Sequence, residues 1–263
     1  MELVNYNNDI EKVKNISPIF IVGLPRSGST LIEALLTSGK DKVISIGENH
    51  SINMSILDQI GGKIYKKNFN FEKFKFQIDY PLFKESVLKK YEEYGLVKEK
   101  TKTILLDKSL ENFFNIDLIL KVFPNAKFLH CNRNLVDEAI AIYQSMLFQL
   151  SWTHKIEDIL NYMDNYIKII NYFEKQYPKN VMNVKLEKLT IDKEKIVRKI
   201  FEFCNLKWDE KSLEFYKRKD LNIRTLSNIQ IRNQITEYNL KKYKPYNYLL
   251  EGYQKKYNWI NLN

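Results

Sequence analysis

The sequence has few of the residues on which small cross-linked or modular proteins depend. Its 263 residues include only 2 cysteines, 3 histidines, 8 glycines and 6 prolines. Two cysteines do not form a disulfide framework, and neither they nor the histidines show the spacing of a metal site, so we expect no metal. With no linker rich in proline, glycine or serine and no internal repeat, we predict a single domain over residues 1–263.

Long apolar runs are also absent. No stretch approaches the roughly 20 consecutive apolar residues that a membrane-spanning helix needs. The N-terminus lacks the basic segment followed by an apolar one that is typical of a secretory signal. We therefore expect no transmembrane segment and a cytoplasmic protein. The hydrophobic content of 44% is sufficient for a substantial core.

Acidic residues are outnumbered by basic ones. The 42 Lys and Arg against 32 Asp and Glu give a net charge of +10, an excess typical of proteins that bind nucleic acids, acidic polymers or membrane surfaces. Here the basic residues are mostly lysine and are dispersed along a chain rich in Asn, Ile and Tyr, so we expect no specific nucleic-acid partner. A non-catalytic protein that binds polyanions is kept as an alternative.

The most informative stretch covers residues 19–36. Residues 19–22 are apolar and mostly β-branched, residues 23–30 form a polar turn bracketed by glycines, and residues 31–36 are apolar enough for a buried helix. This pattern predicts a strand, a turn and a helix. Backbone N–H groups of such a turn converge with the positive end of the helix dipole, which makes a binding site for a phosphate.

The turn has the spacing of a nucleotide-binding P-loop with one change. Gly23 is followed after four residues by Gly28, but Ser29 stands where the P-loop lysine is expected. Serine and threonine hydroxyls bind phosphate without neutralising a triphosphate, and the positive charge has moved to Arg26. The loop therefore favours a ligand with one 5′-phosphate and a transferable group near Arg26. A P-loop kinase or nucleotide hydrolase is the enzymatic alternative.

Further strands and helices alternate along the chain. This alternation predicts an α/β protein, a P-loop-type three-layer fold with a central parallel β-sheet flanked by helices. We expect strands at residues 43–46, 103–106, 126–131 and 181–186, and helices at residues 84–96, 135–150, 155–177 and 192–204.

Chemically reactive side chains follow four of the predicted strands directly. These segments are residues 23–30, 47–50, 107–109 and 132–134. Ligands of parallel α/β sheets bind beyond the carboxyl ends of the strands. We therefore expect the four turns to line one cleft.

Four segments in this order resemble the sulfotransferases that use 3′-phosphoadenosine 5′-phosphosulfate (PAPS), most closely the bacterial branch related to the tyrosylprotein sulfotransferases. They are the PRSGSTL loop at 25–31, DKSLENF at 107–113, the strand and helix at 123–144, and TLSNIQIR at 225–232. The resemblance implies transfer of a sulfuryl group from PAPS to a hydroxyl acceptor, which would be a glycan, phenol, lipid or peptide.

The resemblance also implies roles for individual residues. Arg133 would bind the 3′-phosphate through its fork of donors. Lys108 would contact the transferring group and, with Arg26, would supply the positive charge that a metal ion supplies in kinases. The other positions implied to bind the cofactor are Ser27, Gly28, Ser29, Thr30, Ser227 and Lys242.

The general base and two departures from the family pattern complete the hypothesis. Glu48 is the first choice for the base, because the segment Gly47-Glu48-Asn49 after the second strand resembles the stretch that supplies a glutamate base in the tyrosylprotein branch. His50 is the second choice because imidazole titrates near neutrality. Ala141 stands where the family has a phosphate-binding serine, so that contact is missing or comes from Ser145. Leu186 replaces a tyrosine found in many relatives.

Overall fold

The structure is a computed structural model that describes residues 17–64, 78–94, 104–218 and 232–262. Ser227 lies outside these ranges, as does most of the segment 225–232. The prediction of one domain over the whole chain is not tested by the structure and stays a prediction.

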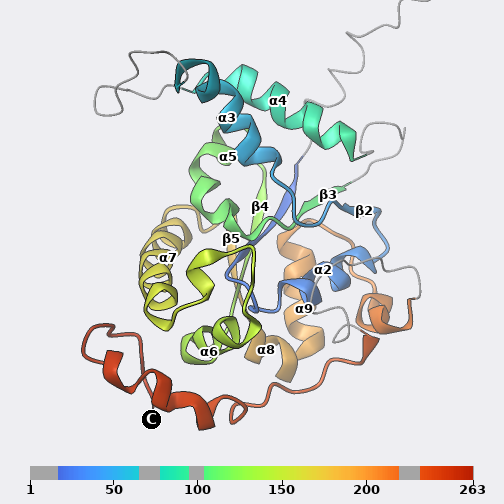
Figure 1. Ribbon diagram of the computed structural model, residues 1–263. Coiled ribbons are helices and arrows are strands. Elements are labelled where there is room, and N and C mark those ends of the chain that lie inside the picture. Colours follow the sequence, from blue (N-terminus) through green and yellow to red (C-terminus); the bar gives the residue numbers. More distant parts are fainter. Residues whose placement is uncertain (1–16, 65–77, 95–103, 219–231, 263) are drawn as a thin grey trace, which may run out of the picture.

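A five-stranded parallel sheet forms the centre, in the order β2-β3-β1-β4-β5 (Figure 1). This confirms the predicted fold class. β1 lies in the middle of the sheet and pairs with β3 on one side and β4 on the other. The strands are β1 (Ile19–Gly23), β2 (Val43–Ser45), β3 (Ile104–Asp107), β4 (Lys127–Asn132) and β5 (Val181–Lys185).

Helices cover both faces of the sheet, as Figure 1 shows for α2 and α7 on opposite sides. The helices are α2 (Ser29–Thr37), α3 (Ser51–Ile64), α4 (Tyr80–Glu93), α5 (Ile116–Val122), α6 (Leu135–Ser145), α7 (Ile156–Gln176), α8 (Leu186–Ile191) and α9 (Lys193–Phe203). The described part of the chain also has short 3₁₀ segments after β3, after α6, after α9 and in the C-terminal tail. These are η1 (Leu110–Asn115), η2 (Ser151–Thr153), η3 (Glu210–Lys217), η5 (Lys244–Leu249) and η6 (Glu251–Tyr253).

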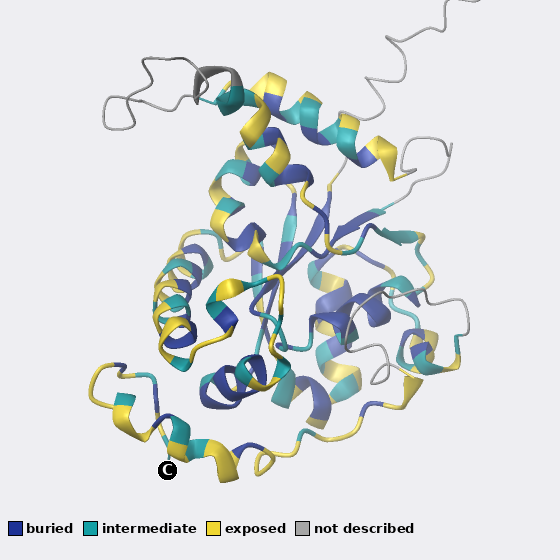
Figure 2. Cartoon of the chain, viewed as in Figure 1, coloured by how far each residue is buried: buried dark blue, intermediate teal, exposed yellow. Residues whose placement is uncertain are grey.

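Alternate residues of β1 belong to two separate apolar cores. Phe20 and Val22 pack with α4, α5, α6 and α7, whereas Ile19 and Ile21 pack with α2 and α9. Successive side chains of a strand point to opposite faces, so a strand buried on both faces reads as one apolar run. The dark blue sheet between partly exposed helices in Figure 2 shows this arrangement.

Two helix boundaries differ from the sequence prediction. The helix expected over 135–150 ends at Ser145, because Met146 has left-handed backbone dihedrals with φ of 40°. The helix expected over 84–96 begins earlier, where the side chain of Asp79 accepts a hydrogen bond from Leu82 N–H. Local backbone conformation sets the end of α6, and side-chain capping sets the start of α4. The spacing of apolar residues indicates neither boundary.

A polar network that includes the buried residues His130 and Tyr166 lies on one face of the sheet at β4. Nδ1 of His130 lies 2.5 Å from Oε1 of Glu174, and Nε2 contacts the hydroxyl of Tyr166. Asn183 donates to the same Glu174 oxygen at 2.7 Å. Burial acts to raise the pKa of Glu174, but the hydrogen bonds from His130 and Asn183 outweigh it and the pKa is lowered. The network therefore favours the ionised carboxylate in the folded protein.

We expect Glu174→Gln to lower the free energy of unfolding at pH 7 by about 1–3 kcal/mol, because buried partners lose a charge-assisted bond. The lowered pKa makes this contribution present above about pH 4.3, the ordinary glutamate value, and it is lost as the pH falls through the folded-state pKa. Urea unfolding from pH 7 to pH 3 should therefore show the difference between the two proteins shrinking.

Asp164→Asn on the same helix is the control for this prediction. Asp164 pairs with the exposed Lys168 four residues away, and such pairs contribute only about 0.3–0.5 kcal/mol. Equal destabilisation by both substitutions, or a difference independent of pH, would show that the Glu174 network does not have this role.

Candidate functional site

The turn between β1 and α2 requires glycine at both ends. At Gly23 an added Cβ would lie 2.4 Å from the carbonyl oxygen of Cys131 on β4. At Gly28, φ is +95° and a Cβ would lie 2.8 Å from a methyl group of Leu186. Between them Arg26 has φ of 70°. A left-handed conformation at a non-glycine residue is costly and is concentrated at functional sites.

Hydroxyl groups converge inside this turn. Ser27, Ser29 and Thr30 are all buried, and Ser29 is the first residue of α2. The Oγ atom of Ser27 is inaccessible and has no hydrogen-bond partner within the described part of the chain. A buried hydroxyl without a partner is costly. A phosphate oxygen at the start of α2 would satisfy it.

Arg133 comes directly after β4 and reaches the turn. Its Nη1 donates to the carbonyl oxygen of Arg26 at 3.1 Å, and its Nη2 contacts the hydroxyl of Tyr238. The guanidinium lies 4.8 Å from the ring centroid of Tyr238 and 4.9 Å from that of Tyr243. Nε is buried without a hydrogen-bond partner among the described residues. The structure thus places Arg133 beside the loop, as the sequence predicted.

Carboxylates surround Arg133 more closely than the sequence suggested. The Asn134 side chain caps α6 by accepting a hydrogen bond from Asp137 N–H at 3.1 Å. The N–H of Asn134 itself donates to Oε1 of Glu187 at 2.6 Å. Glu138 is fully buried, and burial raises its pKa well above the ordinary value although Arg133 opposes this. The raised pKa favours the uncharged form of the Glu138 carboxyl, which would place less negative charge beside the guanidinium.

A cavity of about 420 Å³ opens next to Arg133. It lies between the carboxyl end of β5, the start of α6 and the C-terminal tail. The indole Nε1 of Trp259 on its wall is buried without an acceptor among the residues that the structure describes. The other lining residues that bear on a ligand are Lys185, Glu187, Lys188 and Leu240.

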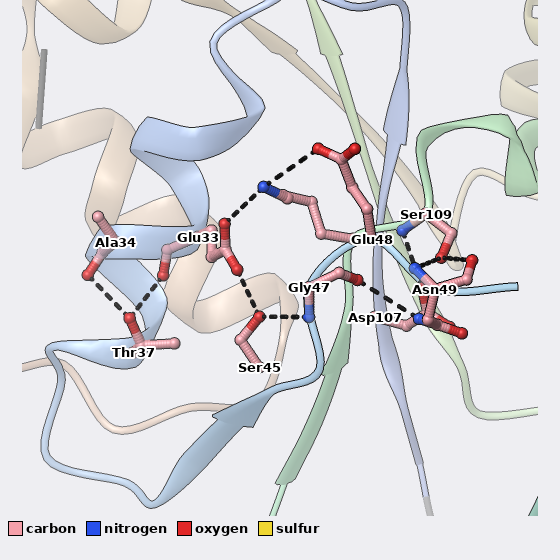
Figure 3. A network of polar contacts seen from close by, with 10 residues as sticks. Glu33, Ala34, Thr37, Ser45, Gly47, Glu48, Asn49, Asp107 and Ser109 are labelled. Atoms are coloured by element: carbon pink, nitrogen blue, oxygen red, sulfur yellow. Dashed lines mark hydrogen bonds and ion pairs between the residues drawn. The ribbon is translucent and has the colours of Figure 1, made fainter. Parts of the chain in front are cut away.

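Lys108 follows β3 and is buried between two carboxylates. Only 1% of the residue is exposed. Its Nζ lies 2.8 Å from Oε2 of Glu33 and 3.5 Å from Oε1 of Glu48 (Figure 3). The Glu33 residue is 3% exposed, whereas the Glu48 side chain is 63% exposed. Glu48 is therefore the carboxylate that a second molecule can reach.

The turns after β2 and β3 are hydrogen-bonded to each other. Ser109 Oγ donates to the carbonyl oxygen of Asn49 at 2.7 Å and accepts from its N–H at 3.1 Å. Oδ1 of Asp107, whose pKa is raised by burial, accepts from Ser109 N–H at 2.8 Å. His50 is exposed, and its carbonyl oxygen bonds Met54 N–H in the first turn of α3. Of the two proposed bases, it is Glu48 that pairs with Lys108.

Ser145 and Lys242 are two further residues that the sequence connected with phosphate or cofactor binding. Ser145 is the last residue of α6 and donates to the carbonyl oxygen of Ala141 at 2.7 Å, so it does not replace the missing serine. Lys242 is exposed, with its Nζ 5.0 Å from the ring centroid of Tyr243. The sequence assigned no cofactor contact to Tyr243, although it packs directly on the guanidinium.

Sequence reasoning missed Glu33. It is a charged residue inside the apolar run 31–36, and such a residue stays buried only with a partner. That irregularity was the available signal. The identity of the partner, Lys108, depends on the order of the strands in the sheet.

Three comparisons with known proteins bear on this site. The family model described as "Sulfotransferase family" matches residues 18–210. A protein from Aquifex aeolicus (strain VF5), described as uncharacterized, is 29% identical over 245 residues, which is 87% of this chain and 30% of that protein. The chain thus spans less than a third of the length of this relative.

Solved structures share the fold. The sulfotransferase domain from the Synechococcus PCC 7002 olefin synthase superposes with a TM-score of 0.62 at 20% identity and 88% coverage of each chain. Mouse sulfotransferase SULT7A1, solved in complex with PAP, gives a TM-score of 0.51 at 11% identity, covering 96% of this chain and 91% of that one. At such low identity these likenesses establish the fold alone.

Gly28→Ala should destabilise the protein by about 1–3 kcal/mol, because a left-handed residue would carry a Cβ that collides with Leu186. Gly252→Ala is the matched control, since a Cβ there meets nothing within 4 Å and Gly252 has no positive φ. Chemical denaturation of both variants tests the prediction. Identical unfolding curves for the two would show that the turn tolerates a side chain.

Proposed function

The chain belongs to the sulfotransferase family, and on this basis we propose that it transfers a sulfuryl group from PAPS to a hydroxyl group of an acceptor. The proposal rests on the observation that a phosphate-binding site and a pair of charged residues lie at the same edge of the sheet. The phosphate-binding turn contacts Arg133 through Arg26, and Lys108 meets Glu48 at the neighbouring strands.

The residues at the turn fit the two phosphate positions of such a nucleotide. The hydroxyl of Ser27 and the N-terminus of α2 would hold the 5′-phosphosulfate. Arg133 would hold the 3′-phosphate, since its buried Nε still has a hydrogen to donate. The adjoining cavity presents Lys185 and Lys188 to an anionic ligand. The mouse sulfotransferase that shares this fold was solved in complex with PAP, which is a nucleotide of this kind.

The proposed chemistry divides between the donor and the chain. When bound, PAPS supplies an activated sulfuryl group. Glu48, exposed at the edge of the site, would accept the proton of the acceptor hydroxyl. Lys108 and Arg26 would place positive charge at the sulfuryl oxygens and the departing phosphate. We propose His50 only as the second candidate for the base, because it does not share the Lys108 contact.

A kinase or nucleotide hydrolase is the less favoured alternative. Ser29, at the start of α2, stands where a P-loop enzyme has lysine. A polyanion-binding protein is less favoured, because Lys108 and Arg133 are buried. Buried cations do not form a surface along which a long polymer could bind. The relation to the tyrosylprotein sulfotransferases stays a prediction, and so does the choice among glycan, phenol, lipid and peptide acceptors.

We propose a cytoplasmic location. Both cysteines, Cys131 and Cys204, are free thiols in the core, which is usual in reducing compartments. Burial raises the pKa of Cys204 to about 12, so its reactive thiolate is scarce. Among the described helices, none combines the length and the apolar character of a membrane span.

Arg133→Ala should weaken the binding of adenosine 3′,5′-bisphosphate by about 10–100-fold, because hydrogen bonds to a charged group contribute about 1.5–3 kcal/mol. Binding of adenosine 5′-monophosphate, which lacks the 3′-phosphate, should change by less than about 3-fold. Isothermal titration calorimetry measures both affinities. Arg198→Ala on α9, where Arg198 pairs with Glu194, is the control. Equal losses for the two nucleotides would remove Arg133 from the 3′-phosphate site.

Arg26→Ala and Lys108→Met should each reduce sulfuryl transfer by at least about 10²-fold, the usual effect of removing one stabilising charge or donor. Lys108→Met keeps the length of the buried side chain. A PAPS turnover assay against phenol, glycan, lipid and peptide acceptors, with circular dichroism as the folding check, measures the effect. Undiminished turnover, or tighter binding of Mg-ATP than of adenosine 3′,5′-bisphosphate, would contradict the proposed function.

A further inference from the structure

The Glu33 carboxylate lies in the first turns of α2, directly behind the phosphate-binding turn. Both of its oxygens are engaged. Oε2 lies 2.8 Å from Nζ of Lys108, and Oε1 accepts a hydrogen bond from Ser45 Oγ at 2.5 Å. An acidic residue at this depth is retained only with partners. Glu33 thereby connects α2 to the last residue of β2 and to the residue that follows β3.

A closed ring of contacts passes through this carboxylate. Ser45 Oγ, which donates to Glu33, also accepts from Gly47 N–H at 3.1 Å. The carbonyl oxygen of Gly47 in turn accepts from the backbone N–H of Lys108 at 3.1 Å. Figure 3 shows Glu33 facing Ser45 and Gly47, with Glu48 next in the chain. One carboxylate therefore fixes both the ammonium group of Lys108 and the turn that carries Glu48.

We propose that Glu33 is a positioning residue for the transfer reaction, which holds the Lys108 ammonium in place and keeps the Glu48 carboxylate available to the acceptor. This inference rests on the proposed function. Glu33 does not touch the nucleotide or the acceptor, and it acts through Lys108 and through the turn at Ser45–Glu48.

The distances indicate how the charge is shared. The ammonium group lies closer to the buried Glu33 than to the exposed Glu48. Coulomb attraction is stronger at the shorter distance and away from water, so Glu33 balances most of the lysine charge. Without the Glu33 charge, Lys108 would have Glu48 as its remaining carboxylate partner. A carboxylate that is ion-paired with an adjacent ammonium is a poorer proton acceptor. The rate of sulfuryl transfer with Glu48 as the base should therefore fall.

Glu33→Gln tests the charge, because glutamine has the same shape and can still accept from Ser45. We expect kcat to fall by about 10–100-fold, as for a misplaced catalytic group. The KM for PAPS and the Kd for adenosine 3′,5′-bisphosphate should change by less than about 3-fold, because the phosphates bind at the turn and at Arg133. Glu194→Gln, in an exposed pair with Arg198, should leave all three values unchanged.

Two further variants separate positioning from a purely structural role. Glu33→Asp restores the charge on a shorter side chain and should recover part of the lost kcat. Ser45→Ala keeps the ion pair but breaks the ring of contacts, and should lower kcat by about 3–10-fold with nucleotide affinity unchanged. If the Glu33→Gln variant does not fold, the Ser45→Ala variant tests the inference in its place.

The outcomes distinguish this inference from the proposed function. An active wild type whose kcat is unchanged by Glu33→Gln or by Ser45→Ala would overturn the positioning role. So would an aspartate variant no more active than the glutamine variant, because the charge would then be irrelevant. A wild type that transfers no sulfuryl group to any acceptor class, yet binds Mg-ATP in preference, would overturn the proposed function and the inference with it.

Discussion

The central position of β1 in the sheet is the constraint on which the site depends. β1 pairs with β3 through Ile19 and Phe20, and with β4 along its whole length, up to Gly23 opposite Cys131. Because the strands are parallel, their carboxyl ends meet at one edge. The turn after β1 is consequently flanked by Lys108 on one side and Arg133 on the other. This placement depends on β3 and β4 being the two neighbours of β1 in the sheet.

The two flanking cations are held in different ways. Lys108 has a buried carboxylate as its nearest partner. Arg133 is 8% exposed and lies against the rings of Tyr238 and Tyr243, which attract it through their π-electrons. Burying a charge costs more free energy than burying an apolar side chain of equal size. Stability alone therefore does not account for the burial of these two cations, which agrees with the roles proposed for them.

Local sequence patterns predicted the elements that local interactions determine. The apolar run at 19–22 and the glycine spacing of the turn both report nearby backbone geometry, and the structure confirms the predicted strand, turn and helix. The contact of the turn with Arg133 was predicted because the carboxyl-edge rule needs only the class of the fold.

Contacts between distant segments account for what the sequence did not predict. The pairing of Glu33 with Lys108 depends on which strand lies beside β1. The occupation of the α6 N-terminus by Glu187 depends on how α8 packs against β4 and β5. Tyr238 and Tyr243 of the tail lie against the Arg133 guanidinium, and nothing in the local sequence indicates this contact. Apolar periodicity identifies buried positions but not the partners they meet there.

The central claim is that one edge of the sheet holds both ends of a doubly phosphorylated nucleotide. A crystal structure of the protein with adenosine 3′,5′-bisphosphate tests it most directly. We expect the 5′-phosphate within hydrogen-bond distance of Ser27 Oγ at the start of α2, and the 3′-phosphate on the guanidinium of Arg133. A nucleotide bound elsewhere, or one bound here with its 3′-phosphate away from Arg133, would contradict the account.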